Sequence, residues 1–222
     1  MNFENFEEKI ATELLDIGAI TFNFSNPYKW ASGWLSPVYC DNRLTLGYPK
    51  IRNTIKEGLI YLLKTNFLKQ GANAIAGVAT AGIPQGILVA DALQIPFGYV
   101  RSKPKDHGRE SQIEGKFENN AKIVVIEDLV STGQSSLNAV SVLKNAGYDV
   151  LGVLAIFSYE FEDAFTSFSN EKIPFYYLCN FNSLLNVAIK KDYITTSQLT
   201  FLQKWHKNPQ NWLSDLSFIQ RY

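Results

Sequence analysis

Sulfur and imidazole side chains are scarce in this chain. Its 222 residues include two cysteines, two histidines and one methionine. Cys40 and Cys179 lie far apart and in no spacing typical of metal ligands, so we expect no structural zinc site. Each cysteine is expected to be a buried free thiol. Free thiols are typical of a reducing compartment, so we expect a cytoplasmic protein.

Long apolar runs and an excess of one charge are also absent. No window approaches the roughly 20 apolar residues of a membrane-spanning helix, and the opening MNFENFEEKI has no apolar signal-peptide core. We therefore expect no membrane partner. The 21 basic residues balance the 21 acidic ones, whereas a polynucleotide-binding protein usually has a basic excess, so no nucleic-acid partner is expected. A small anionic ligand stays open, because a few local basic residues can bind it.

The pattern along the chain predicts one α/β domain spanning residues 1–222. Hydrophobic residues make up 46% of the chain, enough for a sizeable core. Helical spacing of apolar residues marks 3–17 and 48–69, and the last third is helical again, while 21–43 is irregular or has short extended pieces. Short apolar strands are predicted at 74–78, 97–101, 122–127, 150–157 and 175–178, alternating in the middle with helices at 85–93 and 135–145. This alternation predicts a parallel sheet covered on both faces, with ligands beyond the carboxyl ends of its strands.

The strongest signal is KIVVIEDLVSTGQSS, residues 122–136. An apolar strand leads into Glu127 and Asp128, and hydroxyl residues around Gly133 then open a helix. The first N–H groups of a helix are unpaired and attract an anion, and Gly133 allows close approach of the backbone. Ribose hydroxyls, or a magnesium ion carried by the ligand, are natural targets for the two acids. The alternative is a simple helix cap with solvated acids.

This segment resembles the phosphoribosyl-pyrophosphate (PRPP) signature of the type I phosphoribosyltransferases. It has four apolar residues, two adjacent acids, two apolar residues and then S-T-G-x-S. The resemblance implies that the acids bind the ribose and that the following loop binds the 5′-phosphate, through Leu129, Val130, Ser131, Thr132, Gly133, Gln134 and Ser135. It implies Mg²⁺ as a cofactor carried by PRPP near the acids, without dedicated protein ligands. The implied fold is a central parallel sheet flanked by helices, with a hood over the base site formed by residues 1–45 and part of the C-terminal third.

A second signal is the basic stretch YVRSKPKDHGRESQIEGK, residues 99–116. Taken alone, it is either a solvated surface loop or a cationic flap, in which Gly108 and Gly115 would permit movement over a pyrophosphate. It resembles the catalytic loop of orotate phosphoribosyltransferases, which implies catalytic and PRPP-binding roles for Arg101, Lys105 and His107. In that family the loop, here 101–116, acts in the neighbouring subunit, which implies a homodimer with shared sites. Ser102 departs from the family pattern, which often has a second basic residue there.

A third segment, WASGWLSPVYCDNR at residues 30–43, resembles the family's N-terminal stretch over the orotate site. The matching residues are Ser32, Gly33, Ser36, Pro37 and Tyr39. Three departures stand at usual basic positions: Ala31 replaces a lysine, Ala81 follows Thr80 where a Tyr-Lys pair is frequent, and Tyr159 replaces an arginine that binds the orotate carboxylate. The remaining candidates for orotate are Arg43 and the backbone near Ser131.

Together the three segments predict an orotate phosphoribosyltransferase of pyrimidine biosynthesis. The expected reaction converts orotate and PRPP to orotidine 5′-monophosphate and pyrophosphate. A transferase for another base remains an alternative, although it should lack the Arg-x-x-x-Lys-x-His-Gly flap. A regulator on the same fold, which binds nucleotides without turnover, is the other alternative.

Overall fold

The computed structural model describes residues 3–30, 32–103 and 112–212. Its centre is a sheet with the strand order β10-β9-β8-β5-β6-β7. These strands are β5 (Ala74–Val78), β6 (Phe97–Val100), β7 (Ile113–Gly115), β8 (Lys122–Val130), β9 (Asp149–Ser158) and β10 (Phe175–Asn180). All neighbours are parallel except β6 and β7, which are antiparallel. The predicted α/β fold and its five parallel strands are confirmed.

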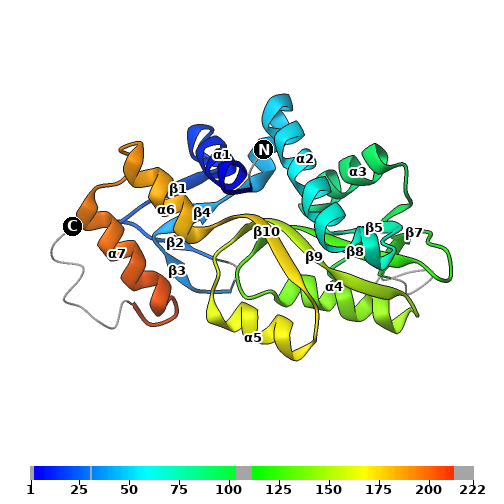
Figure 1. Cartoon of the computed structure of the whole chain (residues 1–222). Helices are drawn as coiled ribbons and strands as arrows, with labels where there is room; N and C mark the ends of the chain where they lie inside the picture. Colours follow the sequence, from blue (N-terminus) through cyan, green and yellow to red (C-terminus); the bar gives the residue numbers. More distant parts are fainter. Residues whose placement is uncertain (1–2, 31, 104–111, 213–222) are drawn as a thin grey trace.

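Helices cover both faces of this sheet (Figure 1). On one face lie α1 (Phe3–Asp16), α2 (Pro49–Asn66) and α3 (Gly82–Leu93), and on the other lie α4 (Gln134–Asn145) and α5 (Glu162–Asn170). Side chains alternate along β8 in keeping with this. Val124 and Ile126 join the core that contains α1 to α3, whereas Ile123 and Val125 join the core that contains α4 and α5. The central strand is therefore apolar on both faces, as buried parallel strands are.

The N-terminal and C-terminal parts of the chain pack together beside the sheet. Two short antiparallel pairs, β1 (Ile20–Phe22) with β4 (Val38–Cys40) and β2 (Tyr28–Lys29) with β3 (Leu35–Ser36), precede the 3₁₀-helix η1 (Asn42–Gly47). Another short 3₁₀-helix, η2 (Leu68–Gln70), follows α2. After β10 come α6 (Phe181–Lys190) and α7 (Thr196–Lys207).

Aromatic side chains join these distant segments. The Trp30 ring lies 6.1 Å from that of Trp205 in α7, and the indole N–H of Trp212 donates to the Leu35 carbonyl at 2.8 Å. The predicted short extended pieces are present at 21–43, and the C-terminal third both supplies the edge strand β10 and covers the N-terminal strands.

The structure corrects several predicted boundaries. Strand β8 continues through the two acids to Val130, because β9 pairs with it as far as that residue. The helix expected at 85–93 begins three residues earlier at Gly82, and the helix expected at 48–69 spans 49–66.

Strand β7 was not predicted, and it shortens the expected flap. The Arg101 N–H donates to the Gln112 carbonyl at 2.8 Å, and residues 113–115 then pair with β6. Gly115 has φ +96°, and a Cβ there would lie 2.9 Å from the Cα of Gly98. It is a glycine required by close strand packing and not the hinge that the sequence suggested.

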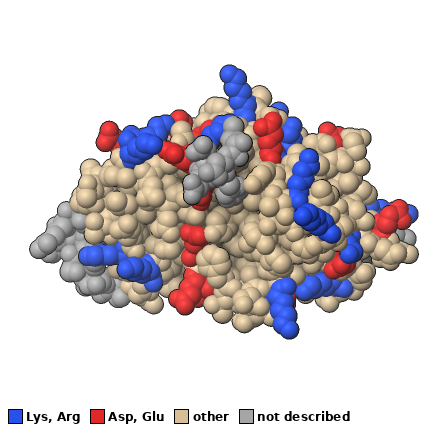
Figure 2. Space-filling view, in the orientation of Figure 1, with Lys and Arg blue, Asp and Glu red and all other residues tan. Residues whose placement is uncertain are grey.

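Charged residues of both signs are interspersed over the face in Figure 2. This distribution fits the formal net charge of +0. Within the part of the chain that the structure describes, no helix is long and apolar enough to cross a membrane.

Candidate active site

The carboxyl ends of β5, β6 and β8 meet at one edge of the sheet, where open α/β sheets bind ligands. A cavity of about 340 Å³ lies there, between the ends of β5 and β6 and the first turns of α4. It is lined by Val78, Ala79, Val100, Arg101, Ser102, Gln134, Ser135, Asn138 and Ala139. The peptide bond between Ala79 and Thr80 at its rim is cis. Among these lining residues, Arg101 carries the positive charge. Its Nη1 lies 3.9 Å from Glu114 Oε1.

The N-terminus of α4 faces this cavity through Gln134 and Ser135. Gly133 is the N-cap residue of α4 and has φ +80°. Glycine has no side chain to cap the helix, so the first N–H groups of α4 have no side-chain acceptor at the N-cap position. A Cβ on Gly133 would lie 2.8 Å from Phe168 Cε2, so both the dihedral angle and the packing require glycine. Unpaired N–H groups and the positive end of the helix dipole suit a phosphate.

The two acids on β8 differ in exposure. Glu127 is 5% exposed, and its carboxylate accepts hydrogen bonds from the Ser136 hydroxyl and the Asp128 N–H, each at 3.1 Å. Burial, followed by the charge of Asp128, raises the pKa of Glu127 well above its usual range. Asp128 is half-buried, and burial is also the main cause that raises its pKa, while Arg43 opposes the rise. A buried pair of like charges favours retention of a proton.

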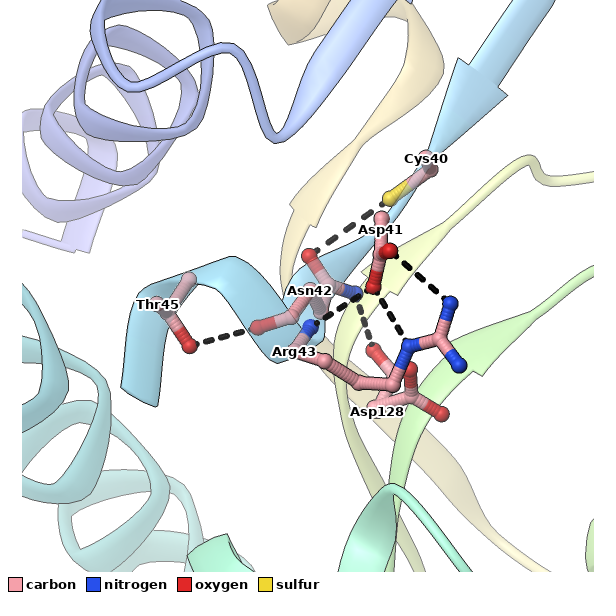
Figure 3. A network of polar contacts seen from close by, with 6 residues as sticks. All are labelled: Cys40, Asp41, Asn42, Arg43, Thr45 and Asp128. Carbon is pink, nitrogen blue, oxygen red and sulfur yellow. Dashed lines mark hydrogen bonds and ion pairs between the residues drawn. The ribbon is translucent and has the colours of Figure 1, made fainter. Parts of the chain in front are cut away.

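A polar network joins η1 to the second acid (Figure 3). Arg43 donates through Nε and Nη2 to the Asp41 carboxylate at 2.6 and 2.8 Å, and this hydrogen bond lowers the pKa of Asp41. The Arg43 side chain is 61% exposed. The Asn42 side chain donates from Nδ2 to the Asp128 carbonyl at 2.7 Å. Residues about 86 positions apart in the chain therefore meet at the end of β8.

Tyr159, which the sequence resemblance aligns with an arginine, is a core residue. It is 1% exposed, and its ring lies 4.9 Å from Trp30 and 5.3 Å from Phe161. Its hydroxyl has no hydrogen-bond partner among the described residues. Burial raises its pKa well above the usual range. The position is therefore closed and neutral, and it offers no cation for a carboxylate.

The structure brings the predicted residues together in two groups. Arg101 shares the cavity with Gln134 and Ser135. Asp128, which bonds to Glu127 through its N–H, is close enough to Arg43 for that cation to act on its pKa. Lys105, His107 and Ala31 lie outside the described residues. Among those that are described, no group of three or more His, Cys, Asp or Glu could hold a metal ion.

Two buried residues at this site were not singled out from the sequence for the roles that the structure gives them. Ser136 is 1% exposed and bonds to Glu127, whereas the sequence placed it only in a hydroxyl-rich helix start. Asn42 is 2% exposed. Its hydrogen-bond partner is the main-chain carbonyl of Asp128, 86 residues away. A local sequence pattern cannot predict such a contact.

Comparison with known proteins agrees with this geometry. The family model of the phosphoribosyl transferase domain matches residues 51–161. Orotate phosphoribosyltransferase from Cytophaga hutchinsonii is 48% identical over 208 residues, which cover 94% of this chain and 99% of the relative. The chain belongs to the orotate phosphoribosyltransferase family. The family protein from Halalkalibacterium halodurans is 47% identical over 211 residues, 94% of this chain and 100% of that one.

Solved structures share the fold of this family member. The orotate phosphoribosyltransferase of Aeropyrum pernix superimposes with a TM-score of 0.72 at 27% identity and covers 84% of this chain and 99% of that one. The UMP synthase of Leishmania donovani has a TM-score of 0.77 at 24% identity, with 92% of this chain and 44% of that one covered. The type I phosphoribosyltransferase fold expected from the sequence is confirmed.

Proposed function

We propose that this protein transfers the phosphoribosyl group of PRPP to orotate, giving orotidine 5′-monophosphate and pyrophosphate in pyrimidine biosynthesis. The observation that carries the proposal is the arrangement at the end of β8. The buried Glu127 and the half-buried Asp128 are followed there by an uncapped helix N-terminus, which faces Arg101 across a cavity of about 340 Å³. This combination matches a ligand that has both ribose hydroxyls and phosphates.

In this proposal the segment after β8 binds the 5′-phosphate of PRPP. The N–H groups of the first turn of α4 and the hydroxyls of Ser131, Thr132 and Ser135 donate to its oxygens. Leu129 and Val130 place the loop, because Val130 is buried in the core. Glu127 and Asp128 accept hydrogen bonds from the ribose hydroxyls. Ser136 holds the Glu127 carboxylate in place for that contact.

Magnesium would arrive with PRPP. The acids offer the oxygen donors that Mg²⁺ prefers, but two carboxylates are too few for a complete site, so phosphate oxygens and water would supply the rest. When bound, the ion neutralises charge on the pyrophosphate. Free thiols at Cys40 and Cys179 support a cytoplasmic, reducing location for this reaction.

Catalysis in this scheme is mainly electrostatic. The bond from the anomeric carbon to pyrophosphate breaks as N1 of orotate approaches, so positive charge grows on the sugar and negative charge on the leaving group. Arg101, Lys105 and His107 would stabilise the leaving pyrophosphate, each by about 2 to 4 kcal/mol. Orotate is already an anion, so no strong base is required.

Orotate would lie between the loop after β8 and the N-terminal strands. Tyr159 provides no cation, so its carboxylate needs other donors, and we propose Arg43 and the backbone near Ser131. The Arg43 guanidinium donates hydrogen bonds to the Asp41 carboxylate through Nε and Nη2. That pairing fixes the direction of the guanidinium and leaves Nη1 for a ligand.

We further propose a homodimer in which the flap of one subunit serves the site of the other. Exposed apolar side chains on η1, at the start of α2 and on α3 support a contact surface: Leu44, Tyr48 and Ile87 are 45%, 47% and 44% exposed. Mixing the Lys105→Ala and Asp128→Asn proteins tests the shared site. After subunit exchange, a flap acting in trans restores about one quarter of wild-type activity, because half of the subunits pair as heterodimers with one intact site each. A flap acting within its own subunit restores none.

The reaction itself is tested by the near-ultraviolet absorbance of orotate. We expect a magnesium-dependent fall when the protein is mixed with PRPP and orotate, and the Asp128→Asn protein serves as a control with reduced rate. No fall, with PRPP still bound by calorimetry, would refute orotate as the acceptor and direct the search to other bases or a regulatory role.

A further inference from the structure

The side chain of Asn42 is the direct link between η1 and the acid pair of β8. It is 2% exposed, and its Nδ2 donates to the main-chain carbonyl of Asp128 at 2.7 Å (Figure 3). A carbonyl only accepts, so the amide nitrogen must face it. The Cys40 thiol, 3.5 Å from Oδ1, then serves as the donor to the other end of the amide.

The turn that carries this amide is itself held in place. The Thr45 hydroxyl donates to the Asn42 carbonyl at 2.6 Å, and Thr45 is fully buried. The Asp41 carboxylate accepts the Arg43 N–H at 3.1 Å. These bonds fix the backbone on both sides of Asn42, so little backbone entropy remains to be lost when its amide contacts β8.

Strand β8 needs this contact where its neighbour ends. Strand β5 ends at Val78, and the last pair in its register with β8 is Gly77 with Ile126. The Asp128 carbonyl lies beyond that point, where β5 no longer supplies donors. Asn42 provides the donor, and an unpaired carbonyl in such a half-buried position is costly.

We infer that Asn42 is a positioning residue that sets the direction of the Glu127–Asp128 pair toward the ribose of PRPP. The inference rests on the proposed role of those acids. Asn42 acts through the backbone of Asp128 and touches no substrate itself. Through its bonds to Cys40 and to the Asp128 carbonyl, it also links the N-terminal segment, on the proposed orotate side of the site, to the phosphoribosyl side.

The Asn42→Asp change tests this inference, because it keeps the shape but replaces the donor with a carboxylate. We expect the KM for PRPP to rise about 10-fold, the typical effect of an unpaired buried carbonyl, with the KM for orotate changing much less. Protonation of the new carboxyl restores a donor, so the deficit relative to wild type at the same pH should shrink as the pH falls. The Asn42→Leu protein also lacks the donor and should show a raised KM for PRPP, but no such recovery.

Asn66 provides a matched control, because its Nδ2 also donates to a main-chain carbonyl, that of Leu62, at 2.9 Å. The Asn66→Asp protein should keep wild-type kinetics with both substrates. Wild-type PRPP kinetics in both Asn42 variants would overturn the inference. So would equal losses for both substrates without pH recovery, or failure of both variants to fold, since each indicates a purely structural residue. A wild-type protein that neither binds nor uses PRPP would instead overturn the proposed function beneath it.

Discussion

Replacing Glu127 by glutamine should stabilise the protein at neutral pH while it weakens PRPP binding. The carboxyl is 5% exposed beside Asp128, and burial raises its pKa well above the usual range. A folded-state pKa above the unfolded value contributes stability that is complete below the unfolded pKa and is lost as the pH rises through the folded pKa. By pH 8, well above the unfolded pKa, the wild type has lost at least part of that contribution, and the neutral amide avoids the loss.

The size of the gain follows from the bonds that survive the change. Glutamine keeps an oxygen for the Asp128 N–H, and its amide nitrogen can donate to the Ser136 hydroxyl, which accepts as well as donates. With both contacts retained, removal of the buried charge should add about 1 to 2 kcal/mol to the free energy of unfolding. For a chain of this length the expected rise in Tm is about 2 to 8 °C.

Scanning calorimetry at pH 8 and pH 5, with and without PRPP and magnesium, measures both effects. Without ligand, the Tm difference between variant and wild type should be largest at pH 8 and shrink toward pH 5. When PRPP is added, the Tm of the wild type should rise more than that of the variant, because the stabilisation by a ligand increases with its occupancy of the folded protein. The Glu171→Gln change, at an exposed carboxyl, serves as the control. It should alter neither the pH dependence of the Tm nor the rise in Tm with PRPP. A variant that is less stable than wild type at pH 8, or a difference independent of pH, would refute the reasoning.

Three further outcomes are expected. Gly133→Ala should cost about 1 to 3 kcal/mol of stability and abolish PRPP binding, because of the φ of +80° and the 2.8 Å contact that a Cβ would make with Phe168. An unchanged Tm in thermal melts and wild-type PRPP affinity by calorimetry would contradict this. Lys105→Ala should lower turnover by about 100-fold or more while PRPP still binds, and unchanged turnover in the absorbance assay would remove the flap from the mechanism. Asp128→Asn should impair use of PRPP; wild-type affinity by calorimetry with normal kinetics would contradict the ribose contact.

Much of the sheet could be predicted because its strands are short, apolar and bounded by turn residues. Buried parallel strands such as 122–126 need no distant information to be recognised. Strand β7 was missed because Ile113–Gly115 is short and follows a polar stretch. It becomes a strand only through pairing with β6.

The site divides in the same way. Glu127, Asp128 and Gly133 stand in one continuous motif, so local spacing was sufficient to nominate them as candidates. Asn42 acts on a carbonyl 86 residues away, and Ser136 acts on a carboxylate 9 residues away on another element. Such contacts depend on how the chain folds back on itself. The burial of Tyr159 likewise depends on Trp30 and Trp205, which come from opposite ends of the chain.

The packing of α7 on the N-terminal strands has a consequence for synthesis on the ribosome. Phe24 contacts Phe201 at 5.7 Å between ring centroids, and Trp212 bonds to Leu35. Because the chain is synthesised from its N-terminus, the early strands must wait for α7 before their apolar faces are covered. The parallel sheet can assemble before then, but the N-terminal cover cannot. Nascent chains stalled before α7 should therefore present exposed tryptophan side chains to chaperones.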